Sequence, residues 1–155
     1  MSKHVSAIPP GYHSVTPYLL IRGAGAAIDF YVNAFGAIEH LRLTAPDGRI
    51  GHAEIQIGTS KVMVADEHPE LEFLGPESRG GTTVSLMVYV TDADSVFSRA
   101  IAAGATELRP LCDQFFGDRS GAVTDPWGHV WSIASRIEDI THEEIQQRFQ
   151  ELYCD

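Results

Sequence analysis

Two stretches of the chain each contain a pair of short, largely apolar runs joined by a tight turn. One stretch runs from Gly117 to Ser135 around a turn at Asp125–Gly128, and the other runs from Ile50 to Ala65 around Gly58–Ser60. Two strands joined by a turn rich in Gly or Pro form a β-hairpin, because Gly adopts positive φ freely and Pro fixes φ for the turn. The hairpins lie 68 residues apart, which predicts that one structural unit occurs twice.

The residues before each hairpin repeat the same order of elements. In the first half, the strand-forming run SVTPYLLI at 14–21 precedes apolar residues at helical spacing that end at Gly36, a typical helix stop, and a strand follows at 38–43. In the second half, the strand TVSLMVYV at 83–90 leads to Asp92, a typical helix N-cap. Each unit is therefore predicted to be βαβββ.

These patterns set the expected boundaries. Pro9-Pro10-Gly11 disfavours regular structure near the N-terminus, and Thr141 with Glu144 has the spacing of a capping box that starts a last helix, packed on the domain or on a neighbouring subunit. The predicted segments are an N-terminal arm at 1–12, a single domain at 13–140 (unit one at 13–66, a linker at 67–81 and unit two at 82–140) and a C-terminal helix at 141–155.

Charge and composition narrow the possible partners and location. The formal net charge of −10 disfavours binding to a nucleic-acid backbone or an anionic membrane, since both need clustered Lys and Arg. No apolar run is long enough for a signal peptide or a membrane span. The two cysteines, Cys112 and Cys154, are too few for a disulfide framework. We expect a cytoplasmic protein with reduced thiols that binds neither nucleic acid nor membrane.

The segments PYLLIRGAGAAIDFYVNAFGA, HAEIQIG and GDRSGAVTDPWGHVWSIA resemble the vicinal oxygen chelate superfamily, which contains glyoxalase I, bleomycin-resistance proteins and extradiol dioxygenases. They are most similar to its PhnB-like branch. The resemblance implies an α+β fold in which two tandem βαβββ units form a curved mixed sheet around a cavity, the glyoxalase/bleomycin-resistance fold. It also implies a homodimer whose subunits often exchange units.

Metal-dependent relatives hold a divalent cation at four strand positions that face the cavity. The resemblance places these positions on Thr16, Val64, Ser85 and Ser132. Hydroxyl and aliphatic side chains do not replace imidazole or carboxylate as ligands for such a cation. We therefore expect no metal and no other cofactor.

Residues two apart on a strand share a face, so parity with these four positions predicts the cavity lining. The opposite face is expected to pack under the helices. The predicted lining residues are Thr16, Tyr18, Leu20, Val62, Val64, Ser85, Met87, Tyr89, Val130 and Ser132.

Polar residues add chemistry to this apolar lining. His52, Glu54 and Gln56 alternate along one strand, so they form either an acid/base pair with a ligand anchor or an exposed or dimer-facing surface. Arg119, next to Asp118, either clamps an anionic group or forms a structural salt bridge. The leading expectation is a metal-free protein that binds a small organic molecule in the inter-unit cavity. The alternative is a metal-dependent lyase, isomerase or dioxygenase that uses His52 and Glu54.

Overall fold

The computed structural model describes residues 5–153. The chain divides into two compact units, Met1–Gly81 and Thr82–Asp155. The outermost residues of the predicted arm (1–4) and of the predicted last helix (154–155, including Cys154) lie outside the described residues.

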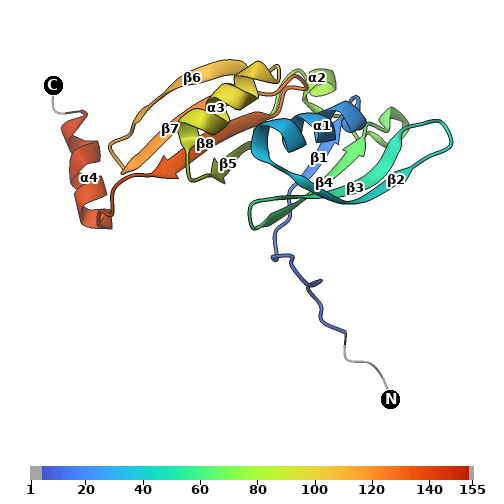
Figure 1. Cartoon of the computed structure of the whole chain (residues 1–155), viewed down its shortest axis with the longest axis horizontal. Coiled ribbons are helices and arrows are strands. Elements are labelled where there is room, and N and C mark those ends of the chain that lie inside the picture. The colour runs from blue at the N-terminus through green and yellow to red at the C-terminus, as the bar shows by residue number, and fades with distance from the viewer. Residues whose placement is uncertain (1–4, 154–155) are drawn as a thin grey trace. The chain divides into compact units, whose positions relative to one another are not determined.

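The first unit contains one helix and a four-stranded sheet, labelled in Figure 1. Its elements are β1 (Tyr18–Ile21), α1 (Ala24–Phe35), β2 (Ile38–Thr44), β3 (Ile50–Ile57) and β4 (Ser60–Asp66). The strand order is β1-β4-β3-β2, with β1 parallel to β4 and the other neighbours antiparallel. The predicted βαβββ order is confirmed.

Helix α1 covers one face of this sheet and makes the core of the unit. It ends at Gly36, which adopts the left-handed conformation (φ 67°) and donates its N–H to the carbonyls of Tyr31 and Val32. The buried side of α1 packs against all four strands. Residues of β3 alternate between this core and the other, open face, as the sequence predicted.

The linker of the first unit is held against its sheet. It contains the short helices η1 (Pro69–Leu71) and α2 (Pro76–Arg79). The buried carboxylate of Glu67 accepts hydrogen bonds from the Gly75 N–H (2.7 Å) and the Ser78 hydroxyl (3.0 Å). A Cβ on Gly75 would lie 2.4 Å from the carbonyl oxygen of Leu20, so only glycine allows this close approach.

The second unit repeats this arrangement. Its elements are β5 (Ser85–Tyr89), α3 (Ala93–Ala102), β6 (Thr106–Asp113), β7 (Asp118–Thr124) and β8 (Val130–Arg136), in strand order β5-β8-β7-β6. Helix α3 packs on β6, β7 and β8. Asp92 caps it by accepting the Ser95 N–H at 3.0 Å, which confirms the predicted N-cap.

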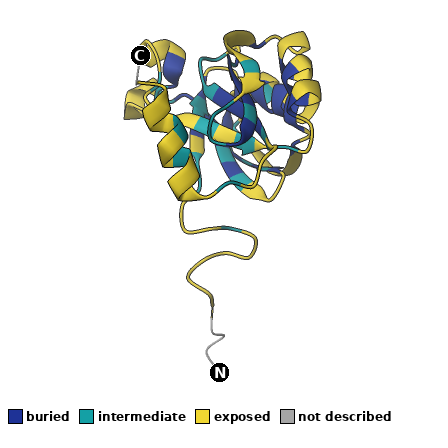
Figure 2. Cartoon of the chain, turned by 90° about the vertical axis from the view of Figure 1, so that its left-hand side faces the viewer, coloured by how far each residue is buried: buried dark blue, intermediate teal, exposed yellow. Residues whose placement is uncertain are grey.

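The last helix, α4 (His142–Glu151), extends the second unit. Thr141 caps it by accepting the Glu144 N–H at 3.2 Å, as its spacing predicted. Arg148 ties it to the unit through the Phe115 carbonyl (3.2 Å) and the Glu138 carboxylate (2.8 Å). Most of α4 is nevertheless exposed, as is the segment that precedes β1 (Figure 2).

A membrane span needs a long and strongly apolar helix. None of the helices in the described part of the chain meets that requirement.

Candidate functional site

The open face of the first sheet is the face that α1 does not cover. Pairing between strands places Tyr18, Met63 and Glu54 in one row across β1, β4 and β3. Because neighbours in register share a face, these side chains all lie on the open side. Leu19, one residue along, pairs with Val64, and both are buried on the helix side.

Three of the predicted site residues are connected on this face. The Tyr18 hydroxyl lies 2.7 Å from Nδ1 of His52, and the two rings are 5.5 Å apart with a tilt of 56°. Nε2 of His52 lies 3.4 Å from Oε1 of Glu54. In the tautomer with hydrogen on Nε2, Tyr18 donates to His52 and His52 donates to Glu54. The structure therefore brings together Tyr18, His52 and Glu54 as one hydrogen-bonded chain.

Tyr12 adds a fourth group that sequence reasoning missed. Within the described chain, its buried hydroxyl forms no hydrogen bond of good geometry, although the Glu54 carboxylate is its close neighbour. Burial first, and then this carboxylate, raise the pKa of Tyr12 to about 12. In return Tyr12, with smaller contributions from His52 and Lys61, holds the pKa of Glu54 below its usual value despite partial desolvation. Burial also raises the pKa of Tyr18.

Gln56 lies further along β3, and other protein groups use its amide. Its Oε1 lies 3.1 Å from Nε2 of His40, and its Nε2 donates to the Gly58 carbonyl at 2.9 Å. A ligand contact at Gln56 stays a prediction.

An apolar hollow of about 430 Å³ opens beside Tyr18. The linker forms one wall of it, through His68, Leu71 and Phe73. We call it the Tyr18 hollow; its lining residues are Tyr18, Leu20, Gly51, Ala65, His68, Leu71 and Phe73. The linker residues of this wall were not predicted, because an irregular segment has no periodicity that reveals which side chains face a site.

The open face of the second sheet has a corresponding row. Met87 pairs with Ser132, Ser132 with Ala122, and Ala122 with Arg109, so the row crosses β5, β8, β7 and β6. A hollow of about 330 Å³ lies over it, and we call it the Met87 hollow. Its lining residues are Met87, Arg109, Pro110, Cys112, Gln114, Phe116, Ser120, Gly121 and Ser132. Met87 and Ser132 were predicted as lining, and Arg109 was missed.

Tyr89 was expected to share a cavity with Met87, but in the second unit they line different hollows. The Tyr89 hydroxyl donates to Oδ2 of the buried Asp118 at 2.8 Å. This hydrogen bond, followed by burial, raises the pKa of Tyr89. The Tyr89 hollow measures about 380 Å³ and is bordered by α4 residues, including Ile145.

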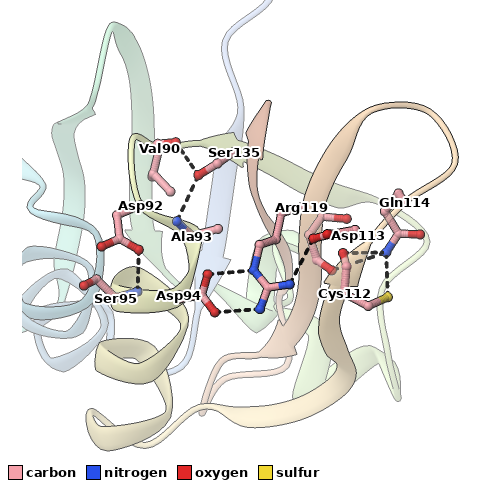
Figure 3. A network of polar contacts seen from close by, with 11 residues as sticks. Val90, Asp92, Ala93, Asp94, Ser95, Cys112, Asp113, Gln114, Arg119 and Ser135 are labelled. Carbon is pink, nitrogen blue, oxygen red and sulfur yellow. Dashed lines mark hydrogen bonds and ion pairs between the residues drawn. The ribbon is translucent and has the colours of Figure 1, made fainter. Parts of the chain in front are cut away.

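Arg119 is not on an open face, which corrects its predicted role as a ligand clamp. It pairs with Ser135 on the helix side of the sheet, and both of its nitrogens Nε and Nη2 bind Asp94 of α3 at 2.7 Å (Figure 3). Its Nη1 donates to Asp113 at 3.0 Å. Asp94 first, and then Asp113, raise the pKa of Arg119. The structural salt bridge, one of the two alternatives, is the arrangement observed.

Val64 was predicted on the open face, and this was wrong. Four residues separate Gln56 from its partner Lys61, whereas five separate Thr124 from Val130 at the corresponding turn of the second unit. The shorter first turn shifts the register by one residue, so Met63 replaces Val64 as the counterpart of Ser132. Val62 has the same parity as Val64 and is also buried on the helix side. A one-residue shift moves a side chain to the opposite face.

The four positions expected to hold a metal in related enzymes are therefore Thr16, Met63, Ser85 and Ser132. Thr16 lies just before β1, where its hydroxyl reaches the His13 carbonyl at 3.5 Å, and Ser85 starts β5 in an exposed position. Hydroxyls and a thioether do not fit a hard or borderline divalent cation. Among the described residues, no group of three or more His, Cys, Asp or Glu side chains is placed to hold a metal ion.

Known proteins share both this fold and much of this sequence. Residues 13–133 match the family model of the Glyoxalase/Bleomycin resistance protein/Dioxygenase superfamily. The uncharacterized protein Mb0911c of Mycobacterium bovis is 43% identical over 136 residues, which cover 86% of this chain and 90% of that protein.

Two solved structures extend the likeness to the fold. The structure of TioX from Micromonospora sp. ML1 is 31% identical, with a TM-score of 0.63 over 83% of this chain and 100% of its own. That of the At5g48480 product of Arabidopsis thaliana is 27% identical, with a TM-score of 0.65 over 79% and 98%. The chain thus belongs to the glyoxalase/bleomycin resistance protein/dioxygenase superfamily, as its motifs indicated.

Proposed function

We propose that this protein binds a small, partly apolar organic molecule in the Tyr18 hollow, without a metal, and that it belongs to the PhnB-like branch of its superfamily. The supporting observation is the hydrogen-bonded chain of Tyr18, His52 and Glu54 at the edge of an apolar hollow. Ligand sites typically combine apolar walls with a few oriented polar groups in this way.

The direction of the hydrogen bonds defines the ligand chemistry. The Glu54 carboxylate favours the tautomer with hydrogen on Nε2 of His52, in which Tyr18 gives its one hydroxyl proton to Nδ1 and its oxygen is left to accept a hydrogen bond from a ligand. Leu20, Leu71 and Phe73 supply apolar surface around it. The ligand that fits has a flat apolar body and an N–H or O–H donor.

A second candidate function is acid/base catalysis with His52 as the base. The link from His52 to Glu54 favours it, since a carboxylate orients an imidazole and stabilises its charged form. A substrate proton would pass to the Tyr18 oxygen as Tyr18 passes its own hydroxyl proton to Nδ1 of His52, whose Nε2–H stays bound to Glu54. Binding is the function common to both candidates.

We also propose that the protein is a homodimer. Both β1 and β2 are edge strands, and β2 exposes Ile38, Leu41 and Leu43. Unpaired edges with apolar side chains favour association. Light scattering should give twice the chain mass of 16.9 kDa, and a monomer mass at micromolar concentration would contradict the proposal.

The binding proposal can be tested with the neutral probe N-phenyl-1-naphthylamine, which has an aromatic body and one N–H donor. We expect its fluorescence to rise on binding. Leu20→Trp should fill the hollow and weaken binding at least about tenfold. Tyr18→Phe, which removes the accepting oxygen, should weaken it about fivefold.

Val32→Trp is the matched control, because Val32 is exposed on α1 and does not line the hollow. Its probe affinity should equal that of the parent. The proposal fails if the parent does not bind the probe, or if Leu20→Trp binds it as the parent does.

A further inference from the structure

Arg109 differs from most arginines of this chain in having no carboxylate partner. Six arginines form ion pairs with Asp or Glu, namely Arg22, Arg42, Arg49, Arg119, Arg136 and Arg148. Arg109 forms no ion pair with any residue that the structure describes; its side-chain contact is the Ser132 hydroxyl, 3.4 Å from Nη2. In a chain with a net charge of −10, Arg109 thus has a guanidinium that no carboxylate of the described residues neutralises.

The row across the second sheet explains how Arg109 reaches Ser132. Ala122 lies between them in register, and its side chain ends at Cβ. The guanidinium can therefore extend over Ala122 into the Met87 hollow, whose lining includes Arg109, Ser132 and Met87. Ser132 is buried, so its hydroxyl is fixed within the hollow.

The charges around this hollow favour an anion. Its lining contains one cationic side chain and neither Asp nor Glu. Of the carboxylates on β6, Glu107 pairs in register with Val123 on the helix side of the sheet, and Asp113 is bound to Arg119. Asp118 accepts the Tyr89 hydroxyl. The Arg109 guanidinium thus keeps free donors that match the two oxygens of a carboxylate.

The walls of the hollow define the rest of the ligand. Met87, Pro110 and Phe116 present apolar surface beside the guanidinium. A bare inorganic anion would leave this surface in contact with water, whereas an aromatic or other apolar carboxylate would cover it. We propose that the Met87 hollow binds an organic carboxylate with an apolar body, held by Arg109 and Ser132. This site lies in the second unit and does not depend on the function proposed for the Tyr18 hollow.

Benzoate and benzamide form a matched pair of probes, since they share a ring and differ in charge. We would titrate the ¹⁵N-labelled full chain with each and follow its amide signals. Benzoate should shift Gly121 and Ser132, with binding in the millimolar range, and benzamide should bind at least about tenfold more weakly. Arg109→Gln should weaken benzoate binding about tenfold or more, and Arg109→Lys less, because lysine keeps the charge but not the fork.

Two further variants test whether benzoate binds in the Met87 hollow and whether loss of any positive charge would weaken its binding. Met87→Trp should fill the hollow and abolish the benzoate shifts. Arg99→Gln removes the same charge from the exposed side of α3 and should leave benzoate affinity unchanged. The inference is overturned if Arg109→Gln binds benzoate as the parent does, if benzamide binds equally well, if the shifts map elsewhere, or if about 50 mM benzoate causes none.

Discussion

The two units present corresponding rows of residues on their open faces, and the chemistry of the rows differs. The first row reads Tyr18, Met63, Glu54 and Leu41, and the second reads Met87, Ser132, Ala122 and Arg109. A carboxylate on the inner strand of the first row attracts the donors around it. Alanine at the same place in the second row leaves Arg109 on the edge strand without a carboxylate partner. The same arrangement of strands thus carries a hydrogen-bonded chain in the first unit and a cationic side chain, Arg109, in the second.

The largest expected effect is a loss of stability when Asp66, which joins α1 to β3 in the first unit, is replaced. One oxygen of this buried carboxylate accepts the N–H groups of Gly23 and Ala24 at the start of α1, and the other accepts that of Ile50. Asp66→Ala leaves these donors unpaired, so we expect a loss of about 3 kcal/mol or more in the free energy of unfolding. Urea denaturation measures it, and hydrogen exchange should show the loss of protection concentrated in the first unit.

Asp29→Ala is the control for this prediction, because Asp29 is an exposed acid on α1. It should change the free energy of unfolding by less than about 0.5 kcal/mol. Equal effects of the two substitutions would show that Asp66 does not tie α1 to β3.

The acidic character of the first row should appear in the pH dependence of stability. The pKa of Glu54 is lowered in the folded state, chiefly by Tyr12, so its charged form contributes stability that is present above the ordinary value of 4.5. This contribution is lost as pH falls below 4.5 through the folded pKa. In thermal melts below pH 4.5, the melting temperature of Glu54→Gln should therefore fall less with decreasing pH than that of the parent.

Tyr12→Phe tests the cause of this shift. Because Tyr12 is the largest contributor to it, the pKa of Glu54 should return toward 4.5, as followed by NMR of its side-chain carboxyl. Ile8→Ala, in the same exposed segment, should leave that pKa where it is. An unchanged pKa in Tyr12→Phe would place the cause in His52 or Lys61 instead.

The smallest change in stability is expected when an arginine is placed in the first unit at Leu41, the position that corresponds to Arg109 in the second unit. In Leu41→Arg the new guanidinium would face Glu54, its partner in register, and should form an ion pair worth about 0.5 kcal/mol. The first unit should therefore gain no benzoate site. Benzoate shifts around residue 41 would show that a neighbouring carboxylate does not decide which arginine binds an anion.

Much of the fold followed from local pattern. Gly36 ended its helix, and Asp92 and Thr141 capped theirs, because these signals depend on neighbours within one turn of helix. Period-two alternation in β3 correctly placed His52 and Glu54 on one face. Their connection to Tyr18 depends on the pairing of β1 with β4, which the order of elements along the chain did not specify.

The errors came from register, which depends on single residues. A turn one residue shorter moved Val64 to the core, and irregular pairing around Arg109 hid its place on the open face. Such irregularities change the alternation of side chains and have no strong sequence signal here. Arg119 was chosen in its place because it follows the turn, although its parity directs it to α3.

The clamp formed by Glu67 has a mechanical consequence. Burial works against its charge, but hydrogen bonds from Ser78, Gly75 and Arg22 hold its pKa below the usual value, so it remains an anion that grips the linker. The wall of the Tyr18 hollow lies between Glu67 and Gly75, upstream of the connection to the second unit. Tension on the chain beyond Ser78 would therefore act on the hydrogen bonds of Glu67 before it reached Leu71 or Phe73. The Tyr18 hollow would keep its shape while the second unit moved.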